Sequence, residues 1–140
     1  MNGSDTKALS KGVQWSLEVW ATIYVAVAVL FIVNPDWVIL VVNQAFARFE
    51  WPMVFFPTEK FWFSLGASVP ATKAYLAFTA ARSPEDARLC VKVLQVSVVL
   101  TGALFAWQFL FHKHAALYVL GFLAEFTQVA FYQVLSRKLP

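Results

Sequence analysis

Four long apolar runs, separated by short polar breaks, dominate the 140-residue chain. The runs cover residues 13–33, 61–81, 88–111 and 115–135. Each approaches or exceeds the ~20 residues that an α-helix needs to cross the ~30 Å hydrocarbon layer of a bilayer. The pattern predicts an all-α integral membrane protein with four transmembrane helices in an up-down bundle.

A fifth, shorter helix is predicted over residues 36–49, after the break at Asn34 and Pro35. Asn34 suits the cap of this helix and Pro35 its first position. Large apolar residues fall on one side of it, and a length of about 21 Å is too short to cross the bilayer. We expect an amphipathic helix in the interface or, equally, a lid packed over the end of the bundle.

The composition agrees with this pattern, because 60% of the residues are hydrophobic and only 14% are charged. A soluble domain has about 45–50% apolar and about 25% charged residues. The four runs leave no room for a soluble catalytic domain, so residues 1–140 are expected to form one membrane domain. The break at Ser83 and Pro84 predicts that the third long helix begins near Pro84.

Two opposite charges are predicted to lie deep in the membrane. Lys73 is nine residues before Arg82, and Glu125 is twelve residues before Arg137. At about 1.5 Å per residue, these positions lie about 13 and 18 Å from the same boundary of the bilayer. A long lysine side chain can bridge that difference in depth, so we expect Lys73 to pair with Glu125.

Glu18 and Lys92 lie at a shallower depth on the same side, and they are expected to form a second pair. Gln95 and Gln128 are candidate neutral hydrogen-bonding neighbours. The deep pair has two interpretations: it sets helix register, or Glu125 exchanges a proton or meets a polar ligand in a midplane cavity. For Glu18 and Lys92, which can extend to the headgroups, the structural interpretation is favoured.

Aromatic residues concentrate in the short helix and in the segment that follows it. Two prolines argue against regular structure between residues 50 and 59, and the rings favour the interface over water. Five of these aromatic residues form a candidate docking surface for other membrane subunits: Trp37, Phe46, Trp51, Phe55 and Phe56. Small residues at four-residue spacing within 61–81 would also let another helix approach closely.

Other chemistries find little support in the sequence. His112 and His114 have no third ligand nearby, so no metal site is predicted. There is no histidine inside an apolar run to hold haem, no nucleophile motif and no glycine-rich phosphate loop. The net charge of +3 forms no basic stripe, which argues against nucleic acid. No cofactor is predicted, although the aromatic residues suit a pocket for a lipid, a quinone or a carotenoid-like molecule.

Three functions from different classes fit these observations. The first is a non-catalytic accessory or assembly subunit of a larger membrane complex, favoured by small size and the candidate docking surface. The alternative is a binder or transporter of a small hydrophobic or protonatable molecule at Lys73 and Glu125, with a homo-oligomer supplying any pathway. A membrane enzyme with Glu125 as acid and base ranks last, because general acid–base catalysis alone supplies only about 10²–10⁴-fold.

The distribution of positive charge favours one orientation. Four spans put both termini on one side, and this side collects most of the Lys and Arg residues, so both termini are expected in the cytoplasm. We expect the protein in a bacterial inner membrane. The layout resembles that of small bacterial four-span proteins of the DoxX-like kind, and no functional residue is taken from this resemblance.

A topology reporter tests this orientation. A reporter protein that is active only in the cytoplasm, fused after Pro140, should be active because the charge bias puts the C-terminus inside. The matched fusion after residue 49 should be inactive. A fusion at Pro140 that proves to be outside would overturn the topology.

Overall fold

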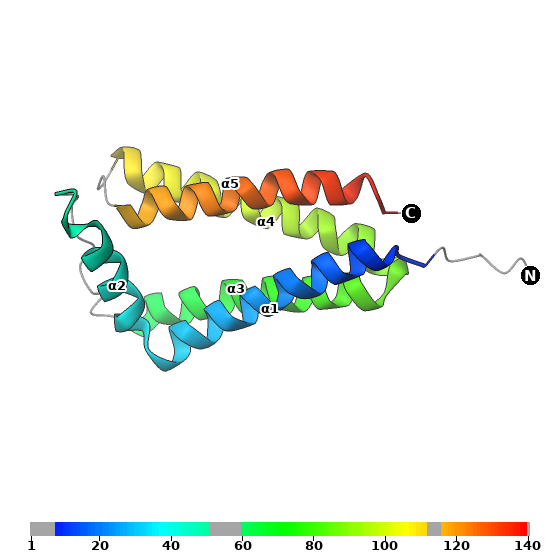
Figure 1. Ribbon diagram of the computed structural model, residues 1–140, viewed down its shortest axis with the longest axis horizontal. Coiled ribbons are helices and arrows are strands. Elements are labelled where there is room, and N and C mark those ends of the chain that lie inside the picture. The colour runs from blue at the N-terminus through cyan, green and yellow to red at the C-terminus, as the bar shows by residue number, and fades with distance from the viewer. Residues whose placement is uncertain (1–7, 51–59, 112–115, 140) are drawn as a thin grey trace, which may run out of the picture.

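Every regular element in the described part of the chain is an α-helix (Figure 1). The computed structural model describes residues 8–50, 60–111 and 116–139. The all-α class predicted from the sequence is confirmed for these residues. In chain order the helices are α1 (Lys11–Val33), α2 (Pro35–Ala47), α3 (Lys60–Arg82), α4 (Pro84–Phe111) and α5 (Ala116–Ser136).

Three of these helices are long and apolar enough to cross a membrane: α1, α4 and residues Tyr118–Ser136 of α5. Helix α3 has 23 residues, which is long enough, but Thr72, Lys73 and Thr79 lower its mean hydropathy. The structure therefore supports an integral membrane protein, and the crossing by α3 stays a prediction.

The four long helices form two antiparallel pairs (Figure 1). Helix α1 packs along α3, and α4 packs along α5. Contact between α3 and α4 joins the pairs. The start of α1 and the end of α5 lie at the same end of the molecule as the connection between α3 and α4 (Figure 1).

A single residue, Ser83, connects α3 to α4. Its backbone N–H donates to the Thr79 carbonyl at 2.9 Å, and its carbonyl accepts from the Asp86 N–H at 3.0 Å. Pro84 takes the first position of α4, where its missing N–H would have no partner in the helix. One residue suffices for this connection because both the N–H and the carbonyl of Ser83 are hydrogen-bonded to the adjoining helices.

Helix α2 crosses the opposite end of the molecule, from the end of α1 toward α5 (Figure 1). The Asn34 side chain accepts from the Trp37 N–H at 3.2 Å, which caps α2 as predicted. Among the α2 side chains that the structure describes, Ile39 is the buried one and is 6% exposed. Helix α2 therefore covers the bundle end as a lid, and its placement in the membrane interface stays a prediction.

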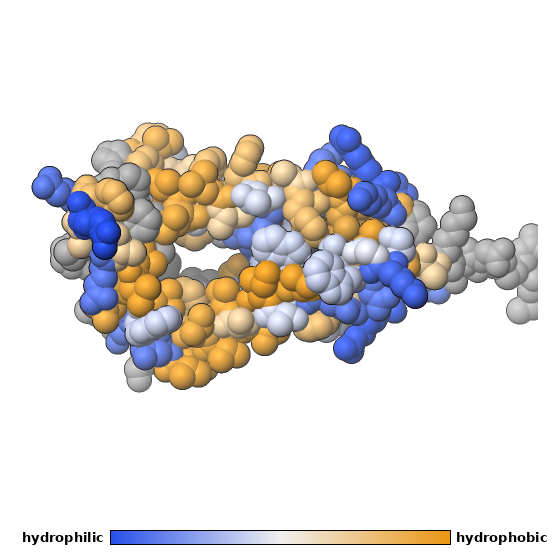
Figure 2. Space-filling view, in the orientation of Figure 1, coloured by the Kyte–Doolittle hydropathy of each residue, from blue (hydrophilic) through white to orange (hydrophobic). Residues whose placement is uncertain are grey.

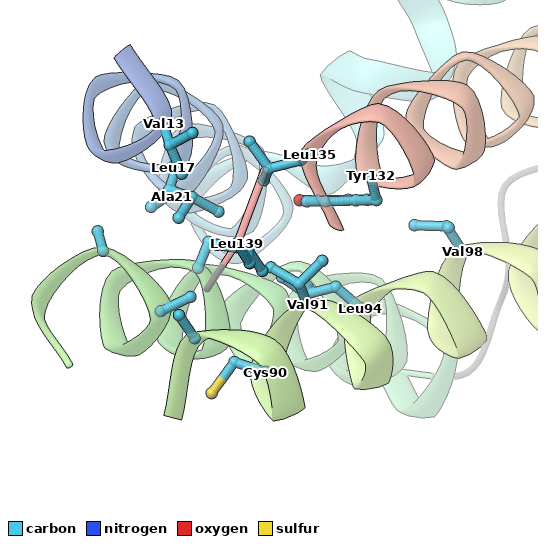
Figure 3. Close-up of a cluster of buried hydrophobic side chains, with 14 residues drawn as sticks. Val13, Leu17, Ala21, Cys90, Val91, Leu94, Val98, Tyr132, Leu135 and Leu139 are labelled. Atoms are coloured by element: carbon cyan, nitrogen blue, oxygen red, sulfur yellow. The ribbon is translucent and has the colours of Figure 1, made fainter. Parts of the chain in front are cut away.

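The main core lies at the end of the bundle where α1 begins and α5 ends, and Figure 3 shows its side chains. It is built from alanines of α3 and mostly larger side chains of α1, α4, α5 and the residues that follow α5. We call it the core cluster, and its members are Val13, Leu17, Ala21, Ala77, Ala80, Ala81, Ala87, Cys90, Val91, Leu94, Val98, Tyr132, Leu135 and Leu139.

Toward α2 each pair stays packed while the two pairs separate. A Cβ on Gly66 of α3 would lie 2.8 Å from the Phe31 ring of α1. A Cβ on Gly121 of α5 would lie 2.7 Å from the Phe105 ring of α4. Figure 2 shows an opening between the pairs on the side of α2, surrounded mostly by hydrophobic residues. The bundle is thus closed at one end and open, beneath α2, at the other.

Candidate functional site

One face of α5 carries a polar stripe that ends in the core cluster. Glu125, Gln128 and Tyr132 follow one another at spacings of three and four residues, so they share one side of the helix. They are 8%, 6% and 0% exposed. Leu135 and Leu139 continue the stripe into the core cluster. The polar part of the stripe therefore lies at the boundary between the closed and the open parts of the bundle.

Lys73 of α3 reaches across to this stripe and pairs with Glu125. Its Nζ donates to the two carboxylate oxygens of Glu125 at 2.7 and 2.8 Å. The Lys73 and Glu125 side chains are 4% and 11% exposed. The lysine nitrogen also lies 5.8 Å from the centre of the Tyr24 ring, within the range of a cation–π interaction. The positive charge is thus neutralised on one side and covered by an aromatic face on the other.

Tyr24 of α1 connects the pair to the rest of the stripe. Its hydroxyl donates to the Gln128 side-chain oxygen and lies 3.0 Å from the Tyr132 hydroxyl. A phenol hydroxyl can donate only one hydrogen bond, and Tyr24 donates it to the side-chain oxygen of Gln128. The Tyr132 hydroxyl therefore donates to Tyr24, and the hydrogen bonds run in one direction from Tyr132 through Tyr24 to Gln128.

These residues form the polar cluster, which is defined as Tyr24, Lys73, Glu125, Gln128 and Tyr132. Helix α4 approaches it as well, because a Cβ on Gly102 would lie 3.3 Å from the Glu125 Cβ. All four long helices therefore meet at one level. Within the described residues, no fully buried side-chain nitrogen or oxygen lacks a hydrogen-bond partner. The polar cluster holds α1 and α3 to α5 through side chains.

The polar cluster has limited chemical capacity. It holds a single carboxylate, and the described part of the chain contains no group of three His, Cys, Asp or Glu residues that would hold a metal ion. Lys73 occupies one acceptor position on each oxygen of that carboxylate. The arrangement suits hydrogen bonding to a polar group at the carboxylate positions that Lys73 leaves open.

The expected pair between Glu18 and Lys92 is not formed. Glu18 accepts a hydrogen bond from Gln14 at 3.0 Å, one turn earlier in α1, and Lys92 is exposed on α4. The physical reason is that α1 packs along α3 rather than α4, so equal depth does not bring the two residues together. Gln95 also lies apart from the pair between Lys73 and Glu125, and it donates to Gln133 of α5 at 3.1 Å.

The predicted docking residues are only partly within the described structure. Trp37 is 49% exposed on α2. The Phe46 side chain and the whole of Trp51, Phe55 and Phe56 lie outside the described part.

Two residues of the polar cluster, Tyr24 and Tyr132, were not predicted from the sequence. A signal for Tyr132 exists, since it follows Glu125 and Gln128 at helical spacing. Tyr24 likewise lies on the buried face of α1, in register with Leu17, Ala21 and Ala28.

Comparison with protein-family models, curated proteins and solved structures finds no match to this chain.

The pair between Lys73 and Glu125 can be tested by its stability. Lys73→Met or Glu125→Leu alone should lower the free energy of unfolding by about 3–5 kcal/mol, because each leaves a buried group without its partner. The double variant should return to within about 1 kcal/mol of wild type. Detergent-based unfolding titrations would measure these changes, and a double variant as unstable as the sum of the single variants would contradict the coupling.

The direction of the tyrosine hydrogen bonds makes a separate prediction. Tyr24→Phe should lower the free energy of unfolding by about 1–3 kcal/mol, because it leaves both Gln128 and Tyr132 without their partner. Tyr132→Phe should change it by only about 0.5–1.5 kcal/mol. Tyr75→Phe is the matched control, since Tyr75 is 70% exposed. Equal losses for Tyr24→Phe and Tyr132→Phe would rule out Tyr24 as the central residue.

Proposed function

We propose that the chain is a four-span membrane protein that binds a small, mainly hydrophobic molecule between its two helix pairs. The polar end of that molecule meets the polar cluster. The observation that carries the proposal is the order of residues along α5: Glu125 and Gln128 lie between Tyr132, which belongs to the core cluster, and Gly121, toward the α2 end where Figure 2 shows the opening between the pairs. In a bundle packed along its whole length, apolar side chains would cover the pair between Lys73 and Glu125 on the α2 side as well.

A crossing by α3 is supported by its length and its partner. Its 23 residues extend for about 34 Å, and it packs along α1, which is apolar enough to cross. Lys73, the charge within α3, is buried and neutralised by Glu125. Lys11, Arg82 and Arg137 all lie near the end that holds the termini, so we place that end in the cytoplasm of a bacterial inner membrane.

The opening itself favours an apolar occupant. In this topology it lies at the level of the hydrocarbon layer, between helices whose outer faces contact lipid. An empty gap there would forfeit the dispersion contacts of the side chains around it. An acyl chain or a flat hydrophobic molecule restores those contacts, and the polar cluster at the closed end would fix which end of the molecule enters first.

A second candidate function is that of an accessory subunit in a larger membrane complex, and two exposed side chains favour it. Trp37 on α2 is 49% exposed, and Tyr75 on α3 is 70% exposed. Tyr75 lies seven residues before Arg82, about 10 Å inside the proposed inner boundary, where a hydroxyl facing lipid has no water to bond. A helix of another subunit that supplies an acceptor would remove that penalty.

Purification in a mild detergent, followed by native mass spectrometry, tests the proposal. The wild-type chain should carry a bound molecule of lipid size. The double variant Lys73→Met with Glu125→Leu should fold and retain about tenfold less, the effect of losing one or two hydrogen bonds to the ligand. Gln133→Leu removes an exposed hydrogen bond elsewhere on α5 and should leave retention unchanged.

Two other outcomes would decide against this function. Equal retention by the wild type and the double variant would remove the polar cluster from the binding site. A stable larger complex in which this chain holds no lipid-sized molecule would favour the accessory subunit.

A further inference from the structure

We propose that the molecule bound in the opening is an uncharged lipid alcohol whose hydroxyl bonds to Glu125 and Gln128. This inference rests on the proposed binding function and assigns the chemistry of the ligand. It follows from the net charge of the polar cluster and from the hydrogen-bonding positions that its members leave open.

The charge of the polar cluster argues for an uncharged ligand. Lys73 and Glu125 cancel each other at 2.7 Å, and Tyr24, Gln128 and Tyr132 are neutral. A ligand carboxylate or phosphate would face Glu125, and a ligand amine would face Lys73, with no unpaired opposite charge to offset its desolvation. Taking an unpaired charge into the membrane interior is strongly unfavourable.

Most donors and acceptors of the polar cluster are already in use. Two of the three N–H donors of Lys73 point to Glu125, and the lysine, whose side chain is only 4% exposed, lies over the Tyr24 ring. The Tyr24 hydroxyl donates its hydrogen bond to Gln128, and the Tyr132 hydroxyl donates its hydrogen bond to Tyr24. The two tyrosines therefore offer no donor to a ligand, and the remaining donor of Lys73 belongs to a side chain that is almost fully buried.

Gln128 is the exception among the donors. Its oxygen accepts from Tyr24, and its side-chain nitrogen has no hydrogen-bond partner within the described residues, although the residue is only 6% exposed. Every fully buried side-chain nitrogen or oxygen in that part of the chain does have a partner. The Gln128 nitrogen must therefore keep some accessible surface, through which it can donate to a ligand.

Glu125 supplies the complementary acceptor. Its side chain is 11% exposed, and each carboxylate oxygen accepts one hydrogen bond from Lys73 while retaining a further lone pair. Glu125 and Gln128 are three residues apart on one face of α5, which puts their Cβ atoms about 5–6 Å apart. A partly exposed carboxylate with free lone pairs and an accessible donor therefore lie side by side.

A hydroxyl group matches this pair of positions, because it donates one hydrogen bond and accepts others. It would donate to Glu125 and accept from Gln128. A quinone or ketone oxygen can only accept hydrogen bonds. It could accept one from Gln128, but its lone pairs would be repelled by the Glu125 carboxylate. An ester oxygen also only accepts and would be repelled in the same way. The apolar remainder of the lipid alcohol would occupy the opening.

Three lipids that share two oleoyl chains test the assignment on the detergent-purified full chain. They are 1,2-dioleoylglycerol with a free hydroxyl, its 3-acetyl derivative, and dioleoylphosphatidic acid with a charged headgroup. Native mass spectrometry at equal lipid concentrations would measure the fraction of chain that retains each lipid. We expect dioleoylglycerol to be retained about tenfold more than either of the other two.

Variants locate the preference. Gln128→Leu should reduce the preference for dioleoylglycerol over its acetyl derivative to about twofold or less, and Gln133→Leu should preserve it. The comparison among lipids on the wild-type chain remains decisive even if Gln128→Leu does not fold.

Equal retention of the acetyl derivative, or stronger retention of phosphatidic acid, would overturn the assignment of an alcohol while leaving the proposed binding function in place. Retention of none of the three, together with no lipid-sized molecule on the chain as purified, would overturn both proposals.

Discussion

The ion pair between Lys73 and Glu125 is the interaction on which the middle of the molecule depends. Within each helix pair, small residues allow close packing, as at Gly66 against Phe31. Between α3 and α5 the connection is made by a long side chain that crosses the space between them. In a membrane, where lipid is as apolar as any side chain, packing and polar contacts rather than water exclusion hold helices together. The pair is therefore both a charge that must be neutralised and a link that sets the separation of the helix pairs.

The tyrosine hydrogen bonds extend this link to α1. Tyr24 accepts from one residue of α5 and donates to another, so its position is defined from two sides. Trp20 lies against both Tyr24 and Phe131, with ring centres 5.8 and 5.5 Å apart, so aromatic contacts between α1 and α5 accompany the hydrogen bonds. The result is a polar layer in which every fully buried side-chain nitrogen and oxygen has a hydrogen-bond partner.

Much of this arrangement was predictable, and the failures have physical causes. Proline and cap residues predicted where α2 and α4 begin, and helical rise predicted that Lys73 and Glu125 share a depth. Depth carries no information about which helices are neighbours, so the same reasoning wrongly paired Glu18 with Lys92. Tyr24 and Tyr132 were missed because a tyrosine is part of an apolar run while also carrying a hydroxyl, and hydropathy patterns do not separate the two roles.

The single-residue connection at Ser83 turns the closed end of the bundle into a pivot. Helices α3 and α4 cannot slide apart there, so a change in the separation of the pairs must be a change in angle. Over the ~34 Å length of α3, a rotation of about 5° moves the far end by about 3 Å, a large part of the width of an acyl chain. Ala81 and Ala87 of the core cluster flank this connection, so the size of the side chains there sets the angle between α3 and α4 and, with it, the width of the opening at the far end.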